Sequence, residues 1–187
     1  MTIGVASLRQ NCLEIKTMSE RKVINLPGQP HFVTFSTYQR RRFLAPERTR
    51  GIVLEVLQSS LKTHAAQCHG FVVMPNHVHA ILSVDTTSTI SSFLHAWKKT
   101  SSYRIKRFYE QELSKYQDMC PVDCPVWQAN FYDFNLETDE KVIQKLDYMH
   151  NNPVIAELAR SSIDWIWSSA RFYEFGEAGI VRIKPCR

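Results

Sequence analysis

Two histidines separated by one residue lie in an apolar stretch, residues 72–82, and this stretch limits the possible folds most strongly. Successive side chains of a strand point to opposite faces, so His77 and His79 share one face while Val78 points into a core on the other. The two histidine Cα atoms would lie roughly 6.5 Å apart, close enough for both rings to bind one metal ion. The alternative is a pair of partly buried histidines, each hydrogen-bonded to a neighbouring group. Both interpretations fit this spacing.

The composition is that of a water-soluble protein, with 187 residues of which 44% are hydrophobic and 22% charged. This length predicts one domain with a substantial buried core. The net charge of +5 favours a polyanionic partner. The chain has no apolar run near the roughly 20 residues of a membrane span, and charged residues between Arg9 and Arg21 interrupt any signal-peptide core. We therefore expect a cytoplasmic protein without membrane contacts.

The five cysteines, Cys12, Cys68, Cys120, Cys124 and Cys186, do not suggest a disulfide framework. Their odd number, their wide scatter and the missing signal peptide all argue against one. Cys120 and Cys124 resemble half of a zinc site. No second pair of Cys or His ligands follows at a suitable spacing, so we interpret them as loop thiols.

The chain divides into an N-terminal arm over residues 1–27, one domain over 28–176 and a C-terminal tail over 177–187. The arm has no clear periodicity and ends in a turn signal at Pro27-Gly28. Met18 begins a segment that resembles a natural start of translation. The arm is therefore expected to be disordered or to result from an over-extended start.

Hydrophobic periodicity predicts the order strand, helix, strand, strand, helix, strand, helix. The expected strands cover residues 31–38, 71–74 and 78–84, and residues 126–136 should form a further strand or an extended segment. The expected helices cover residues 46–66, 91–109 and 138–152, and a short further helix can form at 154–159. A tight turn at Pro75-Asn76 joins the second and third strands, and the segment from Asp164 should pack back on the core. This order is typical of an α+β sandwich of the ferredoxin-like kind, with helices on one face of an antiparallel sheet.

Basic residues cluster at two places. The first cluster follows the first strand and consists of Arg40, Arg41 and Arg42. The second, Lys98, Lys99 and Lys106, lies beside the apolar stripe of the second helix, which consists of Leu94, Trp97, Ser101, Ile105 and Phe108. Such a cluster is usually a solvated helix face, and the alternative is a helix that faces phosphates. Tyr38 and Tyr103 lie near these clusters and can stack on unpaired bases.

The third helix carries a polar face with a tyrosine. Its apolar side consists of Val142, Leu146 and Met149. Tyr148 and Asn152 are four residues apart and therefore share a face away from that side, together with Lys141, Gln144 and Lys145. A tyrosine in such a position is usually structural. Pro153 should end the helix near Asn152 and loosen this spacing.

These residue types together can form a DNA-nicking site. Two imidazoles and an amide oxygen can hold a divalent cation with open coordination positions, and such a cation polarises a phosphodiester. A tyrosine hydroxyl can attack phosphorus and form a covalent phosphotyrosine. Because a free tyrosine has a pKa of about 10, it needs activation. We expect Lys141 and Lys145 to favour the phenolate form.

Four motifs, in this order, resemble the REP-associated tyrosine transposases of the single-tyrosine HUH transposase superfamily. They are Met74-Pro75-Asn76-His77-Val78-His79, Trp127-Gln128 with Phe131-Tyr132-Asp133, Tyr148 with Asn152-Pro153-Val154, and Trp167-Ser168-Ser169. The resemblance covers residues 28–176. It implies a ferredoxin-like fold, a Mg²⁺ or Mn²⁺ ion, and single-stranded DNA hairpins with a short flanking recognition sequence, from extragenic palindromic repeats, as substrate.

The resemblance also implies a role for each matching residue. His77 and His79 would be metal ligands, and Asn152 would take the position of the third ligand. Tyr148 would be the nucleophile that takes the 5′ phosphate and frees a 3′ hydroxyl. The expected DNA-binding residues are Arg40, Arg41, Arg42, Lys98, Lys99, Lys106, Lys141 and Lys145. We expect a monomer, with a dimer as the alternative.

The chain departs from this family at three positions. Members often carry Arg where this chain has Asn130, a basic residue at Ile155 and Gly at Glu157. The departures leave the metal and nucleophile positions unchanged and affect the DNA contacts near the end of the third helix. One alternative function is therefore a DNA-binding protein of the same fold that no longer cleaves. Another is a phosphoesterase for small substrates, which the basic clusters favour less because they suit an extended polyanion.

Overall fold

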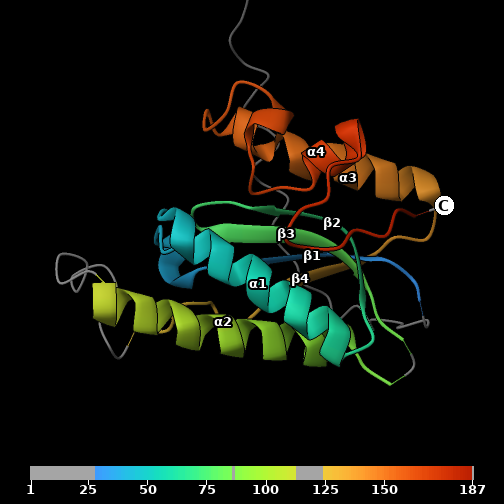
Figure 1. The fold of residues 1–187 in the computed structure, drawn as a ribbon. Helices are drawn as coiled ribbons and strands as arrows, with labels where there is room; N and C mark the ends of the chain where they lie inside the picture. Colours follow the sequence, from blue (N-terminus) through green and yellow to red (C-terminus); the bar gives the residue numbers. More distant parts are fainter. Residues whose placement is uncertain (1–27, 86, 113–123, 187) are drawn as a thin grey trace, which may run out of the picture.

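Four antiparallel strands form one sheet in the order β2-β3-β1-β4 (Figure 1). The computed structural model describes residues 28–85, 87–112 and 124–186. The strands are β1 (His31–Ser36), β2 (Gln67–Val73), β3 (His77–Ser83) and β4 (Tyr132–Asn135). The helices are α1 (Glu47–Thr63), α2 (Ile90–Glu112), α3 (Asp139–Ile155) and α4 (Ala170–Phe175), with short 3-10 helices η2 (Tyr38–Arg40) and η4 (Ser162–Asp164). The predicted α+β class and the antiparallel hairpin of β2 and β3 are confirmed.

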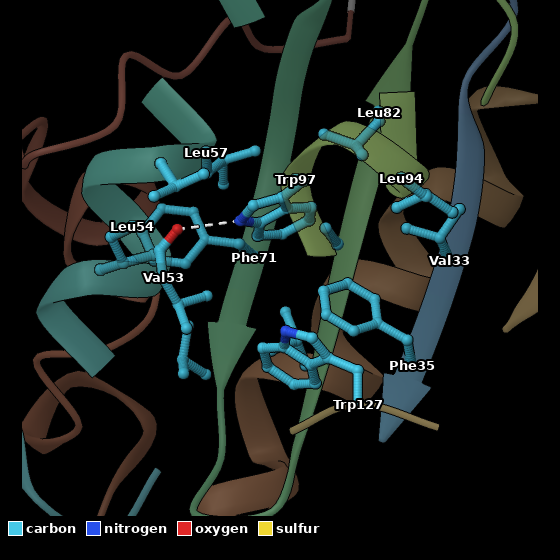
Figure 2. Packing of buried hydrophobic residues seen from close by; sticks show 14 of the residues in the cluster. Val33, Phe35, Val53, Leu54, Leu57, Phe71, Leu82, Leu94, Trp97 and Trp127 are labelled. Carbon is cyan, nitrogen blue, oxygen red and sulfur yellow. Dashed lines mark hydrogen bonds between the residues drawn. The ribbon is translucent and has the colours of Figure 1, made fainter. Parts of the chain in front are cut away.

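The larger core lies between the sheet and helices α1 and α2 (Figure 2). The indole Nε1 of Trp97 on α2 donates a hydrogen bond to the carbonyl oxygen of Val53 on α1, 2.9 Å away. The ring of Phe35 on β1 packs edge-on against Trp97 and Trp127, with centroids 4.9 and 4.8 Å away. Ser101, the polar member of the predicted stripe, accepts a hydrogen bond from Trp127 Nε1 at 3.0 Å. The stripe therefore faces the core as predicted.

Helix α3 covers the opposite face of the sheet, so the expectation of helices on one face only was wrong (Figure 1). Val142, Leu146 and Met149 of α3 pack in a second, smaller core together with Phe32 of β1. Phe32 and Val33 are adjacent and both buried, on opposite faces of the strand. A strand with consecutive buried apolar residues must be covered on both faces, and this signal is present in the sequence.

Gly70 on β2 sets how closely α3 approaches the sheet. A Cβ atom at this position would lie 2.4 Å from Leu146 Cδ2 and 2.4 Å from Met149 Cε. The absence of a side chain on Gly70 therefore lets α3 pack directly on the backbone of β2. The pairing of β2 with β3 shifts register between Cys68 and Gly70, which is typical of a β-bulge.

The C-terminal segment pairs with the outer edge of β2. Val73 N donates to the Trp167 carbonyl oxygen at 2.8 Å, and Lys184 N donates to the Cys68 carbonyl oxygen at 2.9 Å. Trp165 Nε1 donates to the Val73 carbonyl oxygen at 3.1 Å. The segment from Asp164 packs back on the core as predicted, and it covers a sheet edge that would otherwise expose unpaired backbone groups.

Helix α3 continues past Pro153 to Ile155, beyond its expected end. The following residues form a Schellman cap in which Leu158 N donates to the Pro153 carbonyl oxygen and Glu157 N to the Val154 carbonyl oxygen. No separate helix forms over residues 154–159 of the described chain. The cap and the burial of the Pro153 ring outweigh the hydrogen bond that a proline cannot donate.

The expected strand over 126–136 is largely irregular. Only residues 132–135 form β4, and Trp127 makes an isolated bridge to Thr37 because its ring is anchored in the larger core. The short helices α4 and η4 were not predicted. The predictions for residues 1–27 and for Cys120 lie outside the described residues. Among the described helices, none has both the length and the apolar character of a membrane span.

Candidate active site

His77 and His79 project from β3 toward the layer of α3. Their ring centroids lie 4.8 Å apart, with the ring planes at 81°. Val78, between them, is fully buried in the larger core on the other face. The predicted alternation is confirmed, and the two imidazoles are close enough to bind one ion.

Each imidazole is oriented by a hydrogen bond at Nδ1. His77 Nδ1 donates to the side-chain amide oxygen of Asn76 at 2.7 Å. His79 Nδ1 lies 2.6 Å from Thr34 Oγ1 on β1. Asn76 is held in turn by a hydrogen bond from its Nδ2 to the Arg40 carbonyl oxygen at 3.4 Å. This leaves the Nε2 atom of both rings available within the described part of the chain, as for metal-binding histidines whose other nitrogen is bonded to an outer partner.

Both imidazoles are neutral at neutral pH. Burial lowers the pKa of His77 to about 4, and the positive charge of Arg40 contributes. Burial lowers the pKa of His79 to about 3, with smaller contributions from His77, Lys145 and Arg40. Neutral imidazole is the form that binds metal ions. The charge state of the pair therefore fits a cation site.

Tyr148 of α3 packs beside the histidines. Its ring lies edge-on to that of His79, with centroids 5.7 Å apart, and 6.1 Å from that of Phe32. The side chain is 48% exposed, so a large substrate can reach its hydroxyl. Lys145 Nζ lies 5.3 Å from the centroid of the Tyr148 ring. The third helix thus brings a solvent-accessible phenol and a cation to the histidine pair.

Asn152 lies one turn further along α3. Its Nδ2 donates to the Tyr148 carbonyl oxygen at 2.8 Å, so the amide group is held beside the tyrosine. Among the described residues, no group of three His, Cys, Asp or Glu side chains could hold a metal ion. A cation held by the two imidazoles would therefore take its further ligands from groups other than these side chains, such as amide oxygens or substrate.

The predicted DNA-binding residues fall into two groups. Arg40, Lys141 and Lys145 lie at or near the histidine face. The charge of Arg40 acts on both histidines, and Lys145 Nζ lies over the ring of Tyr148. Lys141 is in an ion pair with Glu137 at 2.7 Å.

The other predicted basic residues lie on α2 or after η2. Lys98, Lys99 and Lys106 are on α2, in the layer that covers the opposite face of the sheet (Figure 1). Lys98 Nζ donates to the carbonyl oxygens of Gln128 and Ala129, at 2.7 and 2.8 Å. Arg41 and Arg42 are exposed beyond η2. The fold does not bring the α2 lysines to the histidine pair.

Sequence reasoning missed Thr34 and Asn76 as parts of this site. Asn76 had a detectable signal, because an amide directly before a histidine at a tight turn can reach its ring. Thr34 had none, because its contact with His79 depends on the register in which β1 pairs with β3.

The chain is similar to several known proteins. Residues 27–152 match the family described as "Transposase IS200 like". A curated protein of Haemophilus influenzae, provisionally named a REP-associated tyrosine transposase, is 20% identical over 134 residues, and the match covers 66% of this chain and 73% of that protein. The solved structure of a REP-associated tyrosine transposase bound to a REP hairpin matches with a TM-score of 0.68 at 20% identity, over 89% of this chain and 92% of the other. This structural match shows a common fold.

Proposed function

Since the chain belongs to the IS200-like transposase family, we propose that it cleaves and rejoins hairpin-forming single-stranded DNA through a covalent bond to Tyr148. One observation supports this assignment most strongly. Tyr148 packs edge-on against His79 and remains half exposed, so a nucleophile and a candidate metal site lie on one accessible face. The DNA would be a hairpin of the extragenic palindromic type with a short unpaired flank.

The residues that would hold the metal are His77 and His79, through Nε2, and the amide oxygen of Asn152. The family implies a divalent metal ion, which we take to be Mg²⁺ or Mn²⁺. A bound cation of this kind supplies polarisation of the phosphodiester. Asn76 accepts from His77 Nδ1 and so fixes the tautomer of that ring with Nε2 free, and Thr34 positions the ring of His79.

Tyr148 acts as the nucleophile. Its Oη loses a proton and forms a bond to the phosphorus, while the bond from phosphorus to the 3′ oxygen breaks. The departing 3′ oxygen takes a proton and becomes a free hydroxyl, and the phosphoryl group stays joined to the 5′ end. The charge of Lys145 stabilises the negative charge that develops on the phenol oxygen. Rejoining is the reverse attack by a 3′ hydroxyl on the phosphotyrosine.

A DNA-binding protein that does not cleave is the second candidate. The exposed side chain of Ile155, 73% accessible at the end of α3, favours it, because the resembling family often carries a basic residue there. Loss of a phosphate contact beside the nucleophile would weaken the positioning of the scissile strand without preventing hairpin binding.

The test is formation of a covalent protein–DNA adduct. The protein is incubated with Mn²⁺ and hairpins taken from inverted repeats in the flanking genome, and adducts are separated by denaturing electrophoresis. We expect an adduct that disappears in Tyr148→Phe and persists in the control Tyr103→Phe, which changes an exposed tyrosine on α2. Changing His77 and His79 to Ala should abolish the adduct and leave hairpin binding largely intact. An adduct in Tyr148→Phe would overturn the nucleophile, and binding with no adduct would establish the second candidate.

A further inference from the structure

Among the described residues, α3 leaves part of the edge strand β4 exposed on the sheet face that carries the histidines. Helix α3 packs chiefly on β2 and β3, whereas β1 and β4 form the other half of the sheet. Tyr132 on the edge strand β4 is 53% exposed. An exposed aromatic residue on an edge strand needs no functional explanation by itself, and Tyr132 differs from such residues by its position relative to the candidate active site.

The strand register places Tyr132 in one row with the active-site histidine. Thr34 on β1 pairs with Tyr132 on one side and with His79 on the other. Residues directly opposite in antiparallel strands point to the same face, and the hydrogen bond between Thr34 and His79 shows which face this is. Tyr132 therefore faces the same side as His79, two strand spacings or roughly 10 Å away.

A cation and two further rings lie on the same face as Tyr132 and the nucleophile. Lys145 Nζ lies 5.1 Å from the ring centroid of Phe32 and 5.8 Å from that of Phe134. Phe32 and Phe134 are themselves opposite in register and share this face. Within the described ranges, Lys145 forms no ion pair with a carboxylate. Its charge is therefore available to a phosphate.

We propose that Tyr132 and Lys145 form a subsite for the unpaired flank of the DNA, in which one nucleobase stacks on Tyr132 and an adjacent phosphate binds Lys145. This inference rests on the proposed function. An exposed ring stacks on any unpaired base because every base has a π-face, whereas the bases of a duplex are already stacked on their neighbours. The distance to His79 places the stacked base within a few nucleotides of the scissile phosphate. The sequence-based expectation of stacking on Tyr103 is different, since Tyr103 lies on α2 in the opposite layer.

The experiment measures base stacking through the binding of DNA to the protein. Metal is left out, so that the DNA is not cleaved during the measurement. Hairpins carry the fluorescent base 2-aminopurine at one position at a time along the unpaired flank, and binding is measured in EDTA. With the wild-type protein we expect quenching at one position. Tyr132→Ala should remove the quenching and weaken binding about tenfold, the order of one base–aromatic stack. Tyr132→Phe should restore both, and Tyr103→Ala should change neither.

An abasic substitution at the quenched position gives a second measurement that does not depend on how a variant folds. It should weaken wild-type binding by the same factor and have no further effect on Tyr132→Ala. Wild-type binding without quenching, or full quenching by Tyr132→Ala, would overturn the subsite and leave the proposed function intact. If the wild-type protein binds none of the hairpins, the proposed function fails and the subsite fails with it.

Discussion

Thr34 is the residue that orients the more deeply buried histidine of the site. Its hydroxyl lies 2.6 Å from His79 Nδ1, and its strand register fixes it opposite His79. When Nδ1–H donates to this hydroxyl, the ring takes the tautomer with a free Nε2, which is the atom that would bind the metal. The contact therefore affects metal affinity more than it affects the fold.

Thr34→Val should weaken Mn²⁺ binding by about 10–100-fold, the usual effect of losing an outer hydrogen-bond partner of a metal ligand. Valine keeps the branched shape that suits a strand, so the thermal midpoint should change little. Isothermal titration with Mn²⁺ measures the affinity, and Thr34→Ser, which keeps the hydroxyl, is the matched control. Equal affinities for the valine variant and the wild type would show that Thr34 does not orient the ring.

The residues of the site differ in how far the sequence alone predicts them. His77 and His79 follow from the period of a strand, and the shared face of Tyr148 and Asn152 follows from the period of a helix. Both periods depend only on residues that are close together in the sequence. The distance from Tyr148 to His79 is not local, because it depends on how closely α3 approaches β2 at Gly70.

The cap at the end of α3 contains a residue with an unfavourable backbone conformation. Glu157 has φ +56°, in the left-handed region, and occupies the position of the Schellman cap that glycine usually fills. The REP-associated tyrosine transposases, which this chain resembles, often carry glycine there. A side chain in this conformation costs roughly 1 kcal/mol, so this helix end is strained next to the segment that carries Tyr148 and Asn152.

Glu157→Gly should stabilise the protein by about 1 kcal/mol, because glycine adopts positive φ without steric cost. Urea unfolding measures the change in the free energy of unfolding. The matched control is Glu110→Gly on the exposed face of α2, where glycine should instead cost about 1 kcal/mol. A destabilised Glu157→Gly variant would contradict the strain assigned to this cap.

On the scale of the whole molecule, the sheet separates two layers of different character. The layer of α1 and α2 encloses a large apolar core, and the strength of its helix and strand patterns made its elements predictable. The layer of α3 has a small core next to the candidate site. Its position on the far face was missed because amphipathic patterns show which side of a helix is buried and do not show against which face of the sheet.

Several neutral histidines lie on the α3 side of the sheet, and they make the stability of the protein depend on pH. Burial lowers the pKa of His77 and His150 to about 4 and that of His79 to about 3. In the unfolded chain each would titrate near its ordinary pKa of about 6.5. Between these values the unfolded state binds protons that the folded state does not. Stability is therefore fully present above about pH 6.5 and falls as the pH decreases toward 4.

Each of the three histidines should contribute up to about 1.4 kcal/mol of lost stability per pH unit in this window. Urea unfolding at about pH 7 and about pH 5 measures the slope, and His150→Gln should make it shallower by about the share of one histidine. His95→Gln, on the exposed surface of α2, is the matched control. Since all three histidines lie on the α3 side of the sheet, amide hydrogen exchange should show α3 losing protection at a higher pH than α1 and α2. Simultaneous loss in both layers would mean that the sheet couples them into one cooperative unit, and a flat profile would mean that the histidines are not held neutral by burial.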